Sequence, residues 1–137
     1  MKFLIIFAVG VAVSEACSCL PAGSPKEAFC SSDFVSHVKV TKKNDPNTCA
    51  GGIQNVKYTV QHIKVYRKPS SSYQLSNTIE TASNSAACGV NLEVGKEYLL
   101  GGSVGPDGVL HIGLCGTSTE WSNVPKKDKD ALATYKC

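Results

Sequence analysis

The 137-residue sequence has a single tryptophan, only 7% aromatic residues and a net charge of just +3 at pH 7. So weak an excess of positive charge, scattered along the chain, does not favour nucleic acid as a partner. After residue 13 no apolar run is long enough to cross a bilayer, so we expect no membrane partner. The sequence also shows no paired carboxylates, Ser/His/Asp set or glycine-rich phosphate loop, and we therefore expect no enzymatic activity.

The first 16 residues predict a secretory signal peptide. Lys2 supplies the positive charge, residues 3–13 form a short apolar run, and residues 14–16 (Ser-Glu-Ala) have the small-x-small pattern of a cleavage site. Cleavage there leaves one domain, residues 17–137, whose first residue is a cysteine. We therefore expect a secreted, extracellular protein.

Cysteine is abundant, and all seven cysteines follow the predicted cleavage site, at positions 17, 19, 30, 49, 88, 115 and 137. In a secreted chain this density predicts disulfides. The odd number leaves one cysteine over, and spacing alone does not choose among the roughly 15 pairings of six cysteines. A zinc site at Cys17-x-Cys19 is disfavoured, because zinc ligand pairs usually have a two-residue gap and no second close pair exists. The histidines, His37, His62 and His111, lie far apart in strand-like runs.

Hydrophobic periodicity predicts a mainly β domain. Strands are expected at residues 33–42, 56–66, 75–82, 98–104 and 109–114, with a tight turn at 105–108 and short helices at 24–30 and 125–135. In the second strand Val56, Tyr58 and Val60 alternate, and Ile63 and Val65 then continue on the opposite parity, which predicts a β-bulge. Five such strands fit a small barrel, with a β-sandwich as the alternative.

The N-terminal residues resemble the start of the mature tissue inhibitors of metalloproteinases. Cys17-Ser18-Cys19-Leu20-Pro21 stands directly at the cleavage site, and Ala28-Phe29-Cys30-Ser31-Ser32-Asp33-Phe34-Val35 follows. The similarity continues through residues 56–67, Ala87-Cys88-Gly89, residues 108–112 with Cys115, Trp121 and Tyr135-Lys136-Cys137. It covers essentially the whole predicted mature chain.

The resemblance implies a netrin-like domain: a mainly β, five-stranded OB-fold-like Greek-key barrel with short flanking helices and disulfide links. It also implies the pairs Cys17–Cys88, Cys19–Cys115 and Cys30–Cys137. Cys49 is then unpaired, which agrees with the odd count; it is expected to be free and buried, capped, or joined to a second copy in a disulfide dimer.

The resemblance further implies a metalloprotease inhibitor with no cofactor of its own. Its Cys17 amine and carbonyl would bind the catalytic zinc of an extracellular protease of the matrix metalloproteinase or adamalysin type. Ser18 would face the specificity pocket. The expected contact residues are Cys17, Ser18, Cys19, Leu20 and Pro21, with a second segment of Ser85, Ala86, Ala87, Cys88 and Gly89. Ala86 and Ala87 stand where typical inhibitors carry bulkier side chains.

A second interpretation is a netrin-like binding module that inhibits no protease and uses another surface. Such modules share the barrel but do not expose an N-terminal cysteine. The position of Cys17 at the predicted cleavage site favours the inhibitor. The two alanines and the single-domain length favour the module.

Overall fold

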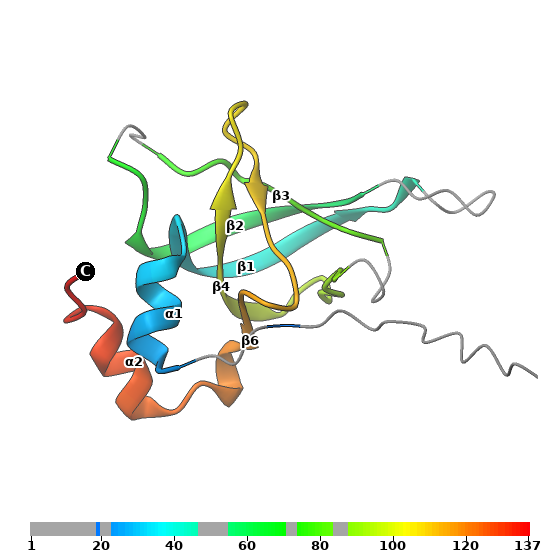
Figure 1. The fold of residues 1–137 in the computed structure, drawn as a ribbon. Helices are drawn as coiled ribbons and strands as arrows, with labels where there is room; N and C mark the ends of the chain where they lie inside the picture. Colours follow the sequence, from blue (N-terminus) through cyan, green and yellow to red (C-terminus); the bar gives the residue numbers. More distant parts are fainter. Residues whose placement is uncertain (1–18, 20–22, 47–54, 71–73, 84–87) are drawn as a thin grey trace, which may run out of the picture.

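The computed structural model of the chain describes residues 19, 23–46, 55–70, 74–83 and 88–137. Its elements in chain order are α1 (Pro25–Ser31), β1 (Phe34–Asn44), β2 (Val56–Arg67), β3 (Thr78–Thr81), β4 (Glu97–Val104), β5 (Leu110–His111), β6 (Thr117–Glu120), the 3-10 helix η3 (Trp121–Asn123) and α2 (Lys126–Leu132). The fold is therefore mainly β, with two short helices, as the sequence predicts (Figure 1).

Five of the strands close into a barrel. Neighbouring strands are hydrogen-bonded in the order β1-β2-β3-β5-β4-β6, and an additional β1–β4 pairing closes the ring. The β3–β5 pair is parallel and the others are antiparallel. β6 lies outside the ring, beside β4. The closed five-stranded barrel confirms the predicted OB-like architecture and removes the β-sandwich alternative.

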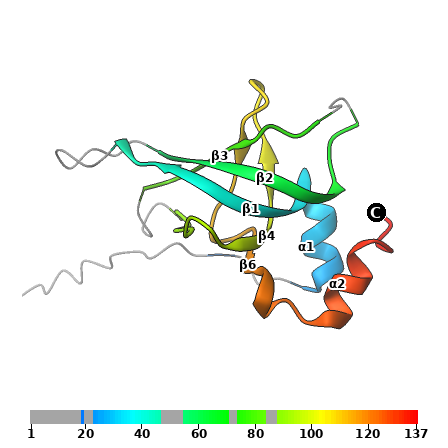
Figure 2. The same cartoon turned by 180° about the vertical axis from the view of Figure 1, so that it is seen from behind.

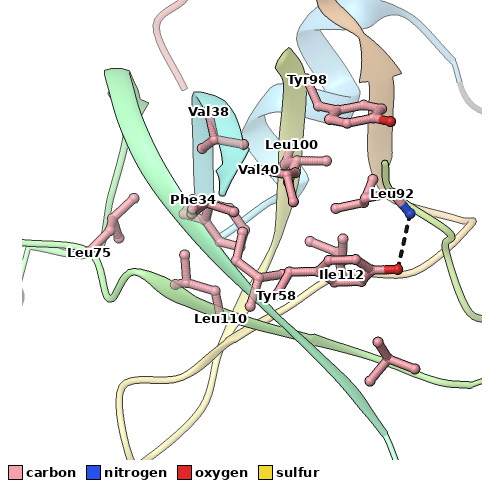
Figure 3. Packing of buried hydrophobic residues seen from close by; sticks show 13 residues of the cluster. Phe34, Val38, Val40, Tyr58, Leu75, Leu92, Tyr98, Leu100, Leu110 and Ile112 are labelled. Atoms are coloured by element: carbon pink, nitrogen blue, oxygen red, sulfur yellow. Dashed lines mark hydrogen bonds between the residues drawn. The ribbon is translucent and has the colours of Figure 1, made fainter. Parts of the chain in front are cut away.

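The interior of the barrel is filled by alternating side chains of the long strands. Phe34, Val38 and Val40 of β1 meet Val56, Tyr58 and Val60 of β2, and all six are at most 5% exposed. Leu100 of β4, Leu110 of β5 and Ile112 complete the core (Figure 3). Burial of these apolar groups supplies the main favourable term in folding.

A smaller apolar cluster lies on the outer face of the barrel. Val35 of β1 and Leu99 of β4 point away from the barrel core and pack with Phe29 of α1 and Leu132 of α2. Both views place α1 and α2 side by side against this end of the barrel (Figure 2). This second layer explains why the first half of β1 is buried on both faces.

The predicted β-bulge in β2 is confirmed. The apolar residues at and after the bulge do not turn into the core, however. Between the pairs His37↔Lys64 and Val38↔His62, one residue of β2, Ile63, has no partner on β1. Ile63 and Val65 remain 48% and 38% exposed and do not join the core. A bulge re-aims side chains, and here it directs two apolar residues outward.

A local signal marks the start of α1, and a contact from a distant strand holds its end. The Ser24 hydroxyl accepts a hydrogen bond from the Glu27 N–H at 3.2 Å, as expected of an N-cap, and Pro25 occupies the first turn. At the other end, Arg67 Nε donates to the Ser32 carbonyl oxygen at 2.8 Å. The arginine therefore ties the end of β2 to the chain that leaves α1.

The turn at residues 105–108 is also confirmed. The Gly108 N–H donates to the Gly105 carbonyl oxygen at 2.9 Å, and Gly108 has a φ of 84°, which favours glycine. β6 and η3, in contrast, were not predicted. β6 is the polar sequence Thr-Ser-Thr-Glu, in which no apolar alternation marks a strand.

Candidate functional site

The structure describes three of the predicted contact residues: Cys19, Cys88 and Gly89. The others lie outside the described residues; these are Cys17, Ser18, Leu20, Pro21, Ser85, Ala86 and Ala87. Cys49 also lies outside them. The geometry of the site is therefore built from the described residues that hold the two predicted contact segments.

Two of the three implied disulfides are present. Cys19 is joined to Cys115 with a Cα–Cα distance of 5.2 Å, and Cys30 is joined to Cys137 at 5.4 Å. Cys88 is also disulfide-bonded. Its implied partner, Cys17, lies outside the described residues, so the pairing Cys17–Cys88 stays a prediction.

The two predicted contact segments attach to neighbouring residues of one short stretch of chain between β5 and β6. Cys19 is covalently bound to Cys115. The adjacent residue, Leu114, donates its backbone N–H to the carbonyl oxygen of Cys88 at 3.0 Å. The residues that flank each segment are thereby brought together, although 69 positions separate Cys19 from Cys88 along the chain.

This stretch is anchored on the barrel by buried and tightly spaced groups. Ile112 is 7% exposed, and its N–H donates to the Glu80 carbonyl oxygen of β3 at 3.0 Å. A Cβ on Gly116 would lie 2.8 Å from the carbonyl oxygen of Gly101, and one on Gly113 would lie 3.2 Å from that of Cys88. The glycines therefore permit a close approach of backbones that larger residues would hinder. Sequence reasoning did not single them out.

The chain after Cys88 is held by side-chain oxygens rather than by a strand ladder. The Val90 N–H donates to Thr81 Oγ1 at 2.9 Å. The Leu92 N–H donates to the Tyr58 hydroxyl at 3.1 Å, and the Glu93 N–H donates to the Tyr98 hydroxyl at 2.9 Å. Figure 3 shows the Tyr58 contact inside the core. The two tyrosines therefore serve both as core residues and as main-chain acceptors, a role that the sequence pattern does not reveal.

Cys88 has a φ of 64°, in the left-handed region that is uncommon for residues other than glycine, asparagine and aspartate. Such conformations cost roughly 1–3 kcal/mol and persist where the surroundings enforce them. Here the disulfide and the Leu114 hydrogen bond constrain the residue from two directions. Strained backbone of this kind is concentrated at functional sites.

The Tyr58 hydroxyl gives a direct test of this support. We expect Tyr58→Phe to lower the free energy of unfolding by about 1–3 kcal/mol, because the buried Leu92 N–H loses its acceptor. Urea unfolding followed by circular dichroism measures the loss. Tyr135→Phe is the control, because the Tyr135 hydroxyl makes no hydrogen bond to any described residue. Equal stability of both variants would show that the Tyr58 contact contributes nothing.

Charged groups connect the same chain to β6. Lys96 Nζ lies 2.9 Å from Glu93 Oε2 and 3.5 Å from Glu120 Oε1. The hydrogen bond to Glu93, with the negative charges of Glu120 and Glu93, raises the pKa of Lys96 above its usual value. The lysine is exposed, so this contact adds little to the stability of the fold.

The three histidines occupy separate positions, as expected. His37 stacks on Trp121 with ring centroids 3.7 Å apart and bonds Glu97 at 2.7 Å. His62 contacts the Ser36 hydroxyl and the Ser76 carbonyl oxygen, each at 2.8 Å. Within the described part of the chain, no three His, Cys, Asp or Glu side chains are grouped to hold a metal ion. None of the described helices is long and apolar enough to cross a membrane.

Comparison with known proteins shows which family this chain resembles in sequence. A model of the family "Tissue inhibitor of metalloproteinase" matches residues 15–137. "Putative metalloproteinase inhibitor tag-225" of Caenorhabditis elegans is 39% identical over 152 aligned positions, which cover 98% of this chain and 96% of that protein. Human "Metalloproteinase inhibitor 2" is 33% identical over 135 positions, covering 94% of this chain and 60% of that protein. This chain thus spans less than two thirds of the human relative.

Among solved structures, the crystal structure of Ancylostoma ceylanicum Excretory-Secretory Protein 2 is similar to this chain. It is 18% identical, covers 87% of this chain and 95% of that chain, and has a TM-score of 0.44.

Proposed function

Because this chain belongs to the tissue inhibitor of metalloproteinase family, we propose that it is a secreted inhibitor of extracellular metalloproteases. The inhibitor acts by binding and is not itself an enzyme. The observation that carries the proposal is the attachment of Cys19 and the Cys88 segment to adjacent residues, Cys115 and Leu114. This arrangement supports a single binding edge made of two chain segments.

The proposed target of the inhibitor's N-terminus is the catalytic zinc of the protease. A catalytic zinc keeps one coordination position for water, and an inhibitor that fills this position removes the nucleophile. The free amine and the carbonyl oxygen of Cys17 would act as a chelating pair once the signal peptide is removed. An α-amino group has a pKa of roughly 7.7–8.0, so little free energy is needed to present its lone pair to the metal.

Rigidity of the terminus is the contribution of the fold. The bond from Cys19 to Cys115 begins two residues after Cys17, and a Cys17–Cys88 bridge would fix the terminus itself. Both bridges would restrict the free N-terminus before it meets the protease. Less conformational entropy is then lost on binding, which strengthens affinity without any new contact.

The remaining residues of the edge provide the contacts along the protease cleft. We assign Ser18 to the main specificity pocket and Leu20 and Pro21 to the neighbouring subsites, with Pro21 stiffening the segment. The second segment, Ser85, Ala86, Ala87, Cys88 and Gly89, lies beside the first in this proposal. The small side chains of Ala86 and Ala87 limit the area that this segment buries.

Residue 18 provides a test of this assignment. We expect Ser18→Gly to weaken inhibition more than Ser18→Thr, because glycine removes the side chain from the pocket and adds backbone freedom. Inhibition constants against one matrix metalloproteinase catalytic domain measure the difference. Equal losses in the two variants would place residue 18 outside the pocket.

An inhibition assay with a panel of matrix metalloproteinase and adamalysin-type catalytic domains tests the function as a whole. Inhibition of at least one protease is the expected outcome. A correctly folded chain that inhibits none of them would support the alternative of a non-inhibitory netrin-like binding module.

Analytical ultracentrifugation with and without reductant would show separately whether Cys49 forms a disulfide dimer.

A further inference from the structure

A cavity of about 180 Å³ lies between the two helices and the outer face of the barrel. Its apolar wall comes from both helices, from β1 and β4, and from the chain before α2. The wall residues that are buried are Phe29, Val35, Leu99, Val124 and Leu132, none more than 7% exposed. The side chains of these five residues are apolar and offer no hydrogen bond to an ordered water.

Two contacts join the elements that surround this space. The Cys30–Cys137 disulfide fixes the end of the chain to α1. The rings of Phe29 and Tyr135 meet with centroids 5.3 Å apart and planes tilted by 58°, which forms a rigid aromatic wall.

Polar groups occur on the side of the cavity that reaches solvent. Thr117 and Thr119 of β6 and Asp128 of α2 belong to its lining, together with Pro25 and Pro125, which are exposed. Asp128 is half-buried. Its carboxylate makes no hydrogen bond or ion pair with any residue that the structure describes. The cavity therefore combines an apolar interior with an anionic group that lacks a cationic partner.

We propose that this cavity binds a small aromatic amine, with the ring in the apolar interior and the ammonium group near Asp128. An engineered apolar cavity of about 150 Å³ in another protein binds benzene, so about 180 Å³ suits a singly substituted benzene ring. The carboxylate of Asp128 favours a cationic substituent over a neutral one, and the threonine hydroxyls accept its remaining hydrogen bonds. The cavity lining contains none of the residues assigned to the protease-binding edge, and this proposal does not rest on the proposed function.

2-Phenylethylamine is the probe, and 2-phenylethanol is its neutral counterpart of the same shape. We expect the amine to bind the folded, disulfide-linked chain saturably at one site in isothermal titration calorimetry. Asp128→Asn should weaken binding of the amine by about tenfold and leave binding of the alcohol unchanged. If Asp128→Asn binds the amine as tightly as the unaltered chain does, the assignment of an amine is overturned.

Occlusion of the cavity tests the location. Ala28 lies in its wall, and Ala28→Leu should abolish binding of both compounds, whereas Ala133→Leu, at an exposed residue outside the lining, should not. In the unaltered chain, the NMR shift changes on adding the amine should centre on Val35, Leu99 and Thr117. This measurement does not depend on the folding of any variant. Absence of saturable binding, or shift changes centred elsewhere, would overturn the proposal.

Discussion

We expect a chain that carries one extra alanine before Cys17 to lose its inhibitory activity. The added residue moves the free amine away from the zinc and converts the Cys17 nitrogen into an amide, which does not donate a lone pair to a metal. We expect an increase in the inhibition constant of at least about a thousandfold, equivalent to about 4 kcal/mol. Titration of a matrix metalloproteinase catalytic domain with the processed and the extended chains measures it.

Two controls separate chelation from misfolding. Acetylation of the amine on the already folded chain should abolish inhibition equally, since it changes no other contact of the protein. An extension that ends in a cleavable sequence should regain full potency after cleavage. Retained potency of the acetylated chain would rule out chelation by the terminus.

Loss of the Cys19–Cys115 bridge has the second largest expected effect. The two cysteines are 96 positions apart, and in the chain-entropy model a disulfide that closes a loop of this length contributes about 4.7 kcal/mol. We expect the double variant Cys19→Ser, Cys115→Ser to lose stability on this scale. It should also lose most of its inhibitory potency, because the terminus is no longer tied to the edge of the barrel.

The second described bridge supplies a matched comparison. Cys30 and Cys137 are 107 positions apart, so removal of their disulfide should cost nearly the same free energy of unfolding. That bridge lies beside the helices and not at the proposed binding edge. Measured at a temperature where both variants are folded, only the Cys19–Cys115 variant should lose potency. An equal loss in both would show that general destabilisation, not attachment of the terminus, sets the affinity.

Most of the barrel followed from local signals in the sequence. The alternation of Val56, Tyr58 and Val60 predicts a strand with one buried face, and the structure buries all three. Ile63 and Val65 continue this apolar pattern but are exposed, because the direction of side chains after a bulge depends on the pairing with β1. β6 could not be predicted, since its polar residues form a strand only by pairing with the edge of β4.

The candidate site was only partly predictable. The position of the first cysteines indicated the N-terminal segment, and the family resemblance supplied its disulfide partners. Sequence patterns gave no sign that Leu114, next to Cys115, holds Cys88, because that contact depends on how β5 and β6 are connected on the closed barrel. The hydrogen bonds of the Tyr58 and Tyr98 hydroxyls could not be predicted for a related reason. An apolar pattern marks a tyrosine as buried but does not show which backbone group its oxygen meets.

The most direct measurement is a stoichiometric titration of metalloprotease catalytic domains with the processed chain, after mass spectrometry has identified Cys17 as its first residue. The proposed mechanism predicts tight, one-to-one inhibition in the nanomolar range for at least one matrix metalloproteinase or adamalysin-type enzyme. No inhibition up to micromolar concentration, with the disulfides verified as intact, would contradict it.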